Sequence, residues 1–504
     1  MPCFPDYAAV AAMMAHKKNA LVWSKIISDM ETPVSAMAKL GMDATSPSFL
    51  LESVHGGENR GRYSMIGLYP DRLWRCFGAR AEFCNHVTAM PQFQPCDQPA
   101  MASLAAELEA LHIDTPAGVP HVAAGLVGYF GYDMIKQTER LPHANPDVIG
   151  IPDAYLMRPR LMLLFDNVDG VMYGFAPLWF REGMDSRAAY DDAVALLRDT
   201  MHQLKERAGA RIYIRPEQSK PLTFNSNMTR EAYHAMVRKA KEYIVAGDIF
   251  QVVPSQRFST PFAVHPFALY RALRYRNPSP FLFYLQMGDF SLVGSSPEIL
   301  VRVRDDVITI RPIAGTRKRG ATPDEDAYLE QELLADAKEI AEHQMLLDLG
   351  RNDVGRAAVP GTVKVTGKMM IERYSHVMHI VSNVEGIRTP DASLVECLMS
   401  GFPAGTVSGA PKIRAMEIID ELEPVSRSFY AGGVGYFSAN GWMDTCITLR
   451  TALIKDGMLY IQAGGGVVYD SDEEAEYQES CTKARAIMSA AELAMQFLDE
   501  EVSS

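Results

Sequence analysis

The sequence predicts an α+β protein in which antiparallel strands build the sheets and helices pack outside them. Strand-like segments follow one another closely, first at 48–78 and again at 281–316, with glycine-rich or polar turns between them. The regular alternation of helix and strand that marks a doubly wound fold is absent. The chain has 504 residues, a length that suggests two or three domains. The polar, proline-containing stretch at 214–227 divides it into domains at 1–225 and 226–504.

Composition and charge exclude several classes of function. The net charge of −13 argues against a general nucleic-acid-binding protein, and the hydrophobic content of 48% is that of an ordinary globular protein. The seven cysteines are scattered and lack the spacing of a zinc site, which fits a reducing compartment. The first residues make a poor signal peptide, and no apolar run reaches the roughly 18 residues that a membrane span needs. We therefore expect a cytoplasmic protein of the size of an enzyme, which binds neither nucleic acid nor a membrane.

In the first half, two elements follow directly from local patterns. The segment 161–175 predicts a hairpin that turns at Asp169 and Gly170, because an Asp-Gly pair between two apolar runs is typical of a tight turn. The segment 185–207 predicts an amphipathic helix from the spacing of its apolar residues.

In the second half, a helix should run from 229 to 246 and end at Gly247, which can adopt the backbone conformation that terminates helices. A strand from 247 to 259 should then carry Gln251. A long helix should extend from 323 to 349, with a proline in its first turn.

The stretch 464–483 combines glycines, acids and a lysine in one short segment. It begins with three consecutive glycines, whose backbone a ligand can approach closely because no Cβ intervenes. A helix should follow, with Glu476 and Glu479 on or beside its buried face and Lys483 one turn further. Carboxylates in such a place are costly unless they are paired or bind a cation.

A second pair of acids, Glu339 and Glu342, lies in the long predicted helix, whose last turns carry apolar residues all round. Two such pairs on two helices predict a site for a hard cation, with Mg²⁺ as the ion that suits carboxylate ligands. The alternative is that these acids occupy a solvated face or the first turn of a helix, near its positive end.

Three further stretches could carry chemistry. The basic loop 315–320 is either a functional loop or a solvated cluster of charges. His376 and His379 lie three residues apart, a pattern for which a core histidine is the usual interpretation. The loop 402–412 is rich in small residues and could present backbone N–H groups to a carboxylate or a phosphate.

These segments together resemble the chorismate-utilising enzymes, most closely the large subunits of anthranilate synthases. The resemblance runs in one order from about residue 247 to 482 and is weaker in the first half, where LLES and GRYS carry it. It implies a two-domain, antiparallel β-sandwich with flanking helices and a substrate cleft in the second domain. The segments that carry it are GDIFQVVPSQRF, GSSPEILV, RPIAGTRKRG, EHQMLLDLGRNDVGR, ERYSHVMHIVS, FPAGTVSGAPK, YAGGVGYF, ITLRTALI and GGGVVYDSDEEAEYQE.

The resemblance implies a role for each of the four acids. Glu342 and Glu479 correspond to ligands of Mg²⁺, which would bind the ring carboxylate of chorismate. Glu339 and Glu476 correspond to the outer-sphere partners of those ligands.

The same resemblance implies catalytic roles and substrate contacts. Glu298 matches the acid that assists loss of the C4 hydroxyl group, and His379 matches a residue tied to pyruvate elimination. Thr406 matches a residue of the catalytic site that contacts chorismate. Arg450 would hold the enolpyruvyl carboxylate, since a guanidinium pairs bidentately with a planar carboxylate. The other expected chorismate contacts are Gly315, Thr316, Tyr430, Gly464, Gly465, Gly466 and Lys483.

Two positions indicate the branch of the family. Gln251 stands where the water-using relatives carry a lysine base, and a neutral amide cannot deprotonate water, so ammonia is the expected nucleophile. Ala314 stands where aminodeoxychorismate synthases typically carry a lysine, which favours direct amination at C2 and the product anthranilate. No glutaminase-like segment occurs in the sequence, so a separate glutamine amidotransferase subunit should supply the ammonia.

Two alternatives stay open at this point. The chain could be an aminodeoxychorismate synthase component, which would release a 4-amino product with its side chain retained. It could also be a catalytically silent subunit that senses an amino acid. Such a subunit should lack the metal-binding acids or Arg450, all of which are present.

The resemblance finally implies feedback inhibition by tryptophan at a separate site. Glu52 and Ser53 would contact the amino acid, with Pro280, Phe281 and Leu282 beside its indole ring. The alternative is that the first segment is part of a core strand and the second an ordinary turn.

Overall fold

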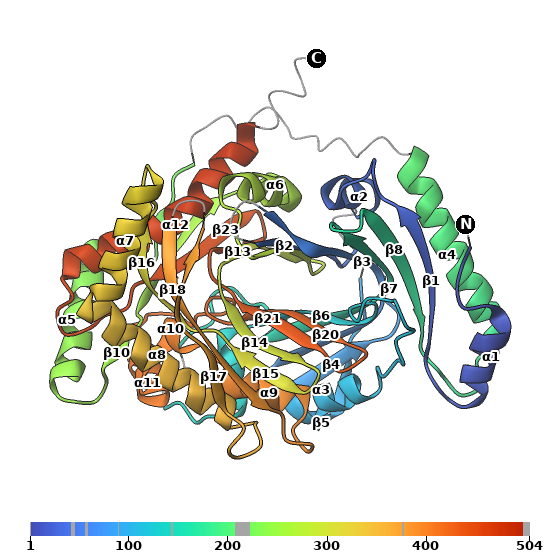
Figure 1. The fold of residues 1–504 in the computed structure, drawn as a ribbon, viewed down its shortest axis with the longest axis horizontal. Coiled ribbons are helices and arrows are strands. Elements are labelled where there is room, and N and C mark those ends of the chain that lie inside the picture. The colour runs from blue at the N-terminus through green and yellow to red at the C-terminus, as the bar shows by residue number, and fades with distance from the viewer. Residues whose placement is uncertain are drawn as a thin grey trace.

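The predicted α+β class is confirmed, with antiparallel strands folded into two facing layers and helices packed outside them (Figure 1). The computed structural model describes residues 2–41, 46–55, 59–88, 90–142, 145–206, 222–374 and 377–496. The helices are α1 (Tyr7–Ala15), α2 (Pro33–Leu40), α3 (Ala100–Glu109), η1 (Tyr132–Gln137, a 3-10 helix), α4 (Ser186–Glu206), α5 (Arg230–Val245), α6 (Pro266–Arg276), α7 (Pro323–Ala335), α8 (Ala337–Gly355), α9 (Leu394–Gly401), α10 (Gly405–Ser408), α11 (Lys412–Leu422) and α12 (Glu473–Gln496).

The strands alternate with these helices in no regular order. Within the described residues, 21 strands are linked by hydrogen bonds into one sheet, and β10 pairs with β19 separately. The strands are β1 (Ala20–Ile27), β2 (Ser48–His55), β3 (Asn59–Phe77), β4 (Arg80–Cys84), β5 (Gln94–Pro99), β6 (Gly125–Phe130), β7 (Ala154–Asp166), β8 (Val171–Leu178), β9 (Asn225–Ser226), β10 (Gln251–Val252), β11 (Ser255–Pro261), β12 (Phe281–Gln286), β13 (Phe290–Ser296), β14 (Ile299–Arg304), β15 (Val307–Ile310), β16 (Ile313–Lys318), β17 (Lys364–Arg373), β18 (Val377–Ile387), β19 (Gly409–Ala410), β20 (Gly433–Ser438), β21 (Met443–Ile447), β22 (Thr451–Lys455) and β23 (Met458–Gly464).

The long strands β3 and β7 belong to both layers. The first part of β3 pairs with β2 and its last part with β4, and its register with β7 shifts between Pro70 and Arg72. In the same way β7 pairs with β6 at its start and with β8 at its end. An irregularity of this kind bends a strand, so one hydrogen-bonded sheet can fold back over itself.

The two halves of the sequence share the layers. Strand β2 pairs with β12, and β6 pairs with β20, so segments far apart in the chain lie side by side. The boundary between 1–225 and 226–504 stays a prediction, and residues 207–221 beside it lie outside the described part of the chain.

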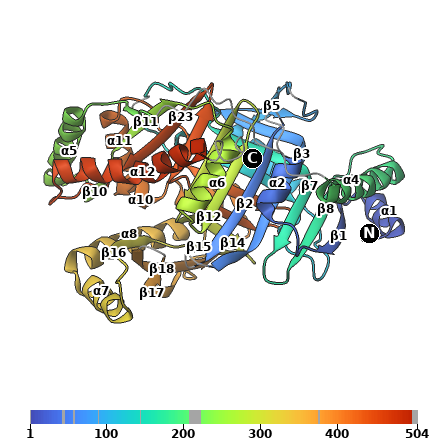
Figure 2. The same ribbon diagram turned by 90° about the horizontal axis from the view of Figure 1, so that it is seen from above.

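Most of the core lies between the layers, and a second core lies under the outer helices. Along β2 the side chains alternate, so that Phe49 packs between the layers and Leu50 packs toward the helices. Figure 2 shows α12, α6, α2 and α4 lying across one outer face. In α12 the predicted stripe of Ile487, Ala491 and Ala494 is buried there.

The helices and the hairpin expected from local patterns are present, with one correction. The hairpin β7–β8 turns at Asp169 and Gly170, and α4 and α5 occupy the predicted ranges. The long helix expected at 323–349 is instead two helices, α7 and α8. Asp336 has a non-helical ψ of 106° between them, and its carboxylate accepts hydrogen bonds from the first N–H groups of α8.

The strand expected at 247–259 is also divided, because Val253 and Pro254 separate β10 from β11. The two pieces join different sheets, and Gln251 lies in β10. No helix within the described residues combines the length and the apolar composition needed to cross a membrane.

Candidate active site

The acids of α8 and α12 approach each other across the glycines that follow β23. Gly465 lies against α12: a Cβ atom built there would lie 2.5 Å from Glu476 Oε2 and 3.5 Å from Glu479 Oε1. Burial raises the pKa of Glu342, and the charges of Glu339 and Glu479 raise it further. The structure therefore brings both predicted acid pairs into one cluster.

Neighbouring polar groups hold this cluster in place. Gln251 Nε2 donates to Glu342 Oε1 at 3.2 Å and also lies against Gly466. Lys483 Nζ forms an ion pair with Glu479 Oε1 at 2.8 Å and donates to the carbonyl oxygen of Gly464 at 3.0 Å.

The basic loop 315–320 also contacts the cluster. Arg317 donates to Glu339 Oε1 at 3.2 Å and to Asp336 at 2.7 Å. The interpretation of this loop as a solvated cluster of charges is therefore wrong for Arg317. Gly315, with a φ of +82°, brings the loop backbone close to Glu339, since a Cβ atom there would lie 3.3 Å from Glu339 Oε2.

The donor set fits Mg²⁺ with few protein ligands. Within the described ranges, no group of three or more His, Cys, Asp or Glu side chains is arranged to hold a metal ion by itself. Glu476 Oε2 and Gln251 Oε1 are buried and accept no hydrogen bond from a described residue. Because Mg²⁺ often binds through one or two carboxylates plus water and substrate oxygens, Glu342 and Glu479 suit it, with Glu339 and Glu476 beside them.

Glu298 is a buried acid in the turn between β13 and β14. Its side chain is 7% exposed, and burial raises its pKa to about 8, so it is largely protonated at neutral pH. Thr406 Oγ1 donates to Glu298 Oε1 at 3.1 Å from α10. Both residues line a cavity of about 30 Å³, which has room for about one water molecule.

His379 on β18 lies beside the basic loop. Its Nδ1 is 2.9 Å from the hydroxyl of Thr316 on the neighbouring strand β16. Burial lowers the pKa of His379, and the positive charge of Arg450 lowers it further, so the ring is neutral at neutral pH. His376 lies outside the described residues.

The guanidinium of Arg450 is not paired with any other described side chain. Burial lowers its pKa, and neither a hydrogen bond nor an ion pair to a described residue compensates for that burial. Tyr430 is also buried, and this burial raises its pKa to about 12. A carboxylate is the ligand that such a guanidinium fits best.

The residues expected to bind tryptophan lie together at β2 and β12, not at the acid cluster. Leu282 on β12 pairs with Glu52 on β2. Glu52 is buried and accepts hydrogen bonds from Tyr270 at 2.5 Å and from Arg274 at 2.6 and 3.1 Å. An ammonium group would therefore have to compete with Arg274 for this carboxylate. Ser53, Pro280 and Phe281 are partly buried at the adjoining ends of these strands.

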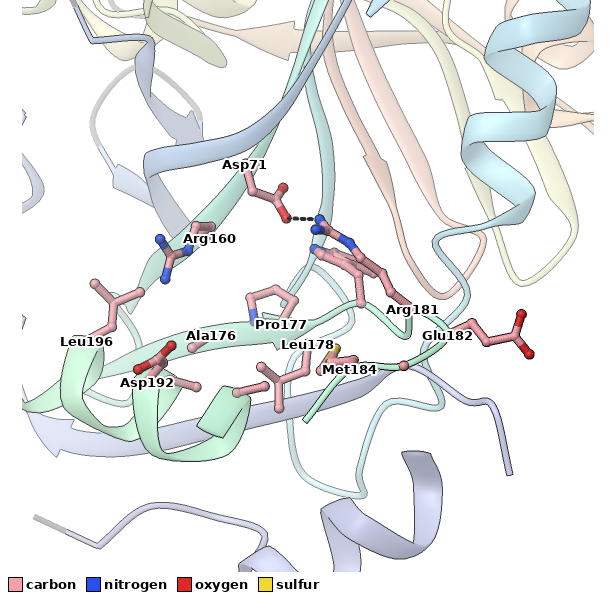
Figure 3. Close-up of a pocket in the computed structure, with 14 residues that line it drawn as sticks. Asp71, Arg160, Ala176, Pro177, Leu178, Arg181, Glu182, Met184, Asp192 and Leu196 are labelled. Atoms are coloured by element: carbon pink, nitrogen blue, oxygen red, sulfur yellow. Dashed lines mark ion pairs between the residues drawn. The ribbon is translucent and has the colours of Figure 1, made fainter. Parts of the chain in front are cut away.

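A larger cavity, of about 420 Å³, lies in the first half of the chain between β8, α4 and the loop after β8 (Figure 3). None of the expected site residues lines it. The carboxylate of Asp71 at its edge is already neutralised by Arg158, at 2.7 and 2.9 Å, and lies 3.8 Å from Arg181. Since the perturbed acids lie elsewhere, the glycine and acid cluster is the better candidate for the active site.

Sequence reasoning missed two contacts that shape this site. Ser471 Oγ donates to Glu476 Oε1 at 2.7 Å, and Asp336 both begins α8 and pairs with Arg317. The only sequence signal for these contacts was their nearness in the chain to residues already singled out.

The comparisons with known proteins show the family of the chain. The sequence profile described as chorismate binding enzyme matches residues 49–489. Anthranilate synthase component 1 of Cereibacter sphaeroides is 55% identical over 476 residues, which cover 94% of this chain and 95% of that protein. The Pseudomonas aeruginosa protein of the same name is 47% identical over 478 residues, covering 94% and 95%.

Two solved structures are similar to this one. Anthranilate synthase component I from Streptococcus pneumoniae TIGR4 is 34% identical, with a TM-score of 0.73, and the match covers 85% of this chain and 92% of that one. The menaquinone-specific isochorismate synthase of Escherichia coli is 21% identical, with a TM-score of 0.68 and coverage of 96% and 99%. At 21% identity, the similarity to the isochorismate synthase concerns the fold alone.

Proposed function

The chain belongs to the chorismate-binding enzymes as an anthranilate synthase component I, and from this premise we propose the reaction that it catalyses. It converts chorismate and ammonia into anthranilate, pyruvate and water. A separate glutamine amidotransferase subunit, the component II of such a complex, releases the ammonia from glutamine. The observation that carries this proposal is the contact of the Gln251 amide with Glu342, because an amide at this place cannot activate water.

Each end of the substrate has a complementary group in the site. The guanidinium of Arg450, which pairs with no side chain among the described residues, binds the enolpyruvyl carboxylate with two parallel hydrogen bonds. Mg²⁺, held by Glu342 and Glu479, would neutralise the ring carboxylate and so offset its repulsion from the four acids. Glu339 and Glu476 keep the two ligands in place, and Lys483 contributes a further positive charge beside Glu479.

Two side chains are suited to the proton transfers. Glu298, protonated at neutral pH, gives its proton to the C4 hydroxyl, which leaves as water while ammonia adds at C2. Thr406 orients this carboxyl through its hydrogen bond to Oε1. The neutral ring of His379 can then accept the proton from C2 as the C3–O bond breaks, which makes the ring aromatic, and return that proton to the departing enolpyruvate, which becomes pyruvate.

Product identity tests the proposal. The purified chain, given chorismate, Mg²⁺ and ammonium, should form anthranilate and pyruvate in equal amounts, measured by mass spectrometry. An aminodeoxychorismate synthase would instead release a 4-amino product that retains its side chain, with no pyruvate. Ala314 disfavours that outcome because its side chain has no nucleophilic atom for a covalent route. Detection of the 4-amino product would overturn the assignment.

We propose in addition that tryptophan inhibits the enzyme at the junction of β2 and β12, which is separate from the acid cluster. There the amino acid would displace Arg274 from Glu52 and place its indole beside Phe281 and Leu282. Such inhibition is allosteric, so tryptophan and chorismate must weaken each other's binding by the same factor.

A further inference from the structure

A fully buried ion pair lies between the end of α11 and β20. Arg427 Nη2 is 2.6 Å from Glu423 Oε1, and the two side chains are 1% and 2% exposed. Removing two charges from water costs several kcal/mol for each ion, and their attraction often does no more than offset that cost. An ion pair in such a place is weak evidence for stability, so its other contacts indicate what it does.

The guanidinium of Arg427 joins two segments of the candidate active site. Its Nη1 donates to the carbonyl oxygen of Val407 at 2.7 Å, and its Nη2 donates to that of Val253. Val407 follows Thr406 in α10, and Val253 directly follows the strand that carries Gln251. The planar guanidinium thus holds the backbones beside the proton-donor pair and beside the amide at a fixed separation.

The carboxylate of Glu423 holds a third segment. Its Oε1 accepts hydrogen bonds from the backbone N–H of Ser255 at 2.9 Å and from its hydroxyl at 2.8 Å. Ser255 pairs with Gly464 where β11 meets β23, at the start of the three glycines. The position of Ser255 therefore sets the position of the backbone that faces Glu476 and Glu479.

The ion pair also contacts a fourth part of the site. The guanidinium carbon of Arg427 lies 5.3 Å from the centre of the Tyr430 ring and 4.9 Å from that of Tyr132. Tyr430 is an expected chorismate contact, and its side chain is buried. One ion pair therefore touches segments that are far apart in the sequence and that meet at the site.

We propose that the Arg427–Glu423 pair is a positioning device for catalysis. It fixes Thr406, Gln251, Gly464 and Tyr430 relative to one another, and it touches the reacting groups only through them. This inference rests on the proposed function, because the geometry it maintains is that of the chorismate site. A displacement of about 1 Å in such a site can lower the rate by about 100-fold.

The chain offers a matched control for testing this inference. Arg158 on β7 is also buried and paired with a carboxylate, that of Asp71, at 2.7 and 2.9 Å. It likewise lies over an aromatic ring, 4.9 Å from the centre of Trp179, and its side-chain hydrogen bonds within the described part of the chain go to Asp71 rather than to the site segments. Arg427→Lys and Arg158→Lys therefore make the same chemical change inside and outside the proposed positioning device.

The experiment measures kcat and KM for chorismate with saturating ammonium and Mg²⁺, at a temperature where each variant is folded. Both variants should have lower thermal unfolding midpoints, because lysine cannot reproduce the planar fork of arginine. Arg427→Lys should lower kcat by about 100-fold, and more than it raises KM, since Thr406 and Glu298 act in bond breaking. Arg158→Lys should leave kcat within about threefold of the unsubstituted enzyme.

Two milder variants keep the test decisive if Arg427→Lys fails to fold. Glu423→Gln keeps an acceptor for Ser255 but removes the charge. Ser255→Ala removes the two hydrogen bonds of the hydroxyl, which donates to Glu423 and accepts from Gln462. Each substitution should lower kcat by about 3- to 10-fold. The inference is overturned if the folded Arg427 or Glu423 variants keep the original kcat, or lose no more than Arg158→Lys does. Failure of the unsubstituted enzyme to make anthranilate would instead refute the proposed function.

Discussion

Replacing Glu298 by glutamine should stabilise the protein and inactivate it. Glu298 is 7% exposed, and burial raises the pKa of its carboxyl group from an ordinary 4.5 to about 8. A raised carboxyl pKa means that the folded state holds its proton more tightly than the unfolded state does. The contribution to stability is therefore fully present below pH 4.5 and is lost as the pH rises toward 8.

The size of this effect follows from the pKa. A rise from 4.5 to about 8, at about 1.4 kcal/mol for each pH unit, amounts to about 5 kcal/mol as an upper bound. At pH 8 the folded protein must bury an ionised carboxylate, and Glu298→Gln removes this free-energy cost. The substitution also removes one hydrogen-bond acceptor, which costs about 1–2 kcal/mol. We expect a net gain of about 3 kcal/mol in the free energy of unfolding at pH 8, measured by urea denaturation.

The same substitution should lower kcat by about 100-fold or more, because the amide cannot donate the proton to the leaving hydroxyl. In the unsubstituted enzyme, kcat/KM for chorismate at saturating ammonia should fall above a pH of about 8, as Glu298 ionises. Thr406→Val should move this fall to higher pH, because the hydroxyl of Thr406 donates to the carboxylate and lowers its pKa. A kcat within threefold of the original in Glu298→Gln, or a fall that moves to lower pH in Thr406→Val, would refute this reasoning.

Three further predictions concern the metal, the nitrogen source and the inhibitor. Glu342→Gln and Glu479→Gln should each remove most activity while folding survives, because a hard cation loses an anionic ligand; full activity of the unsubstituted enzyme in excess chelator would contradict the Mg²⁺ site. The isolated chain should use ammonium, fastest at mildly alkaline pH, where free ammonia becomes abundant and Glu298 still keeps its proton, and should use glutamine only after a glutaminase subunit is added. Glutamine-dependent turnover by the chain alone would be the contrary result. Ser53→Phe should relieve inhibition by tryptophan and leave ammonium-dependent catalysis nearly unchanged, and calorimetry that detects no tryptophan binding would exclude this site.

Features that depend on residues close together in the chain could be predicted from the sequence. The helices α4 and α5 follow from their apolar periodicity, and the β7–β8 hairpin follows from Asp169 and Gly170. The acids at 339, 342, 476 and 479 were recognisable because each pair lies one helical turn apart beside apolar residues. In each case the physical cause lies within a few residues of the element that it shapes.

Contacts between distant segments could not be predicted in this way. The pairing of β2 with β12 joins Glu52 to Leu282, and no local pattern specifies which edges of a sheet will meet. The break at Asp336 also escaped prediction, because an acid within a helical pattern resembles any solvated residue until Arg317 is found beside it. Arg427 and Glu423 belong to this group, since their partners at Val253 and Ser255 lie 174 and 168 residues away.

The acid cluster conflicts with the rule that buried charged groups are paired or hydrogen-bonded. Burial and neighbouring negative charge raise the pKa of both Glu342 and Glu476, and Glu476 Oε2 has no hydrogen-bond partner among the described residues. Gly465 makes the arrangement possible, because any Cβ there would lie 2.5 Å from that oxygen. Such groups would be costly in a purely structural core, so the cluster is best explained by a ligand that supplies positive charge when it binds. The same conflict allowed part of the site to be recognised from the sequence, since a buried acid such as Glu476 has no structural purpose of its own; Glu479, expected on or beside the buried face of α12, is instead 49% exposed.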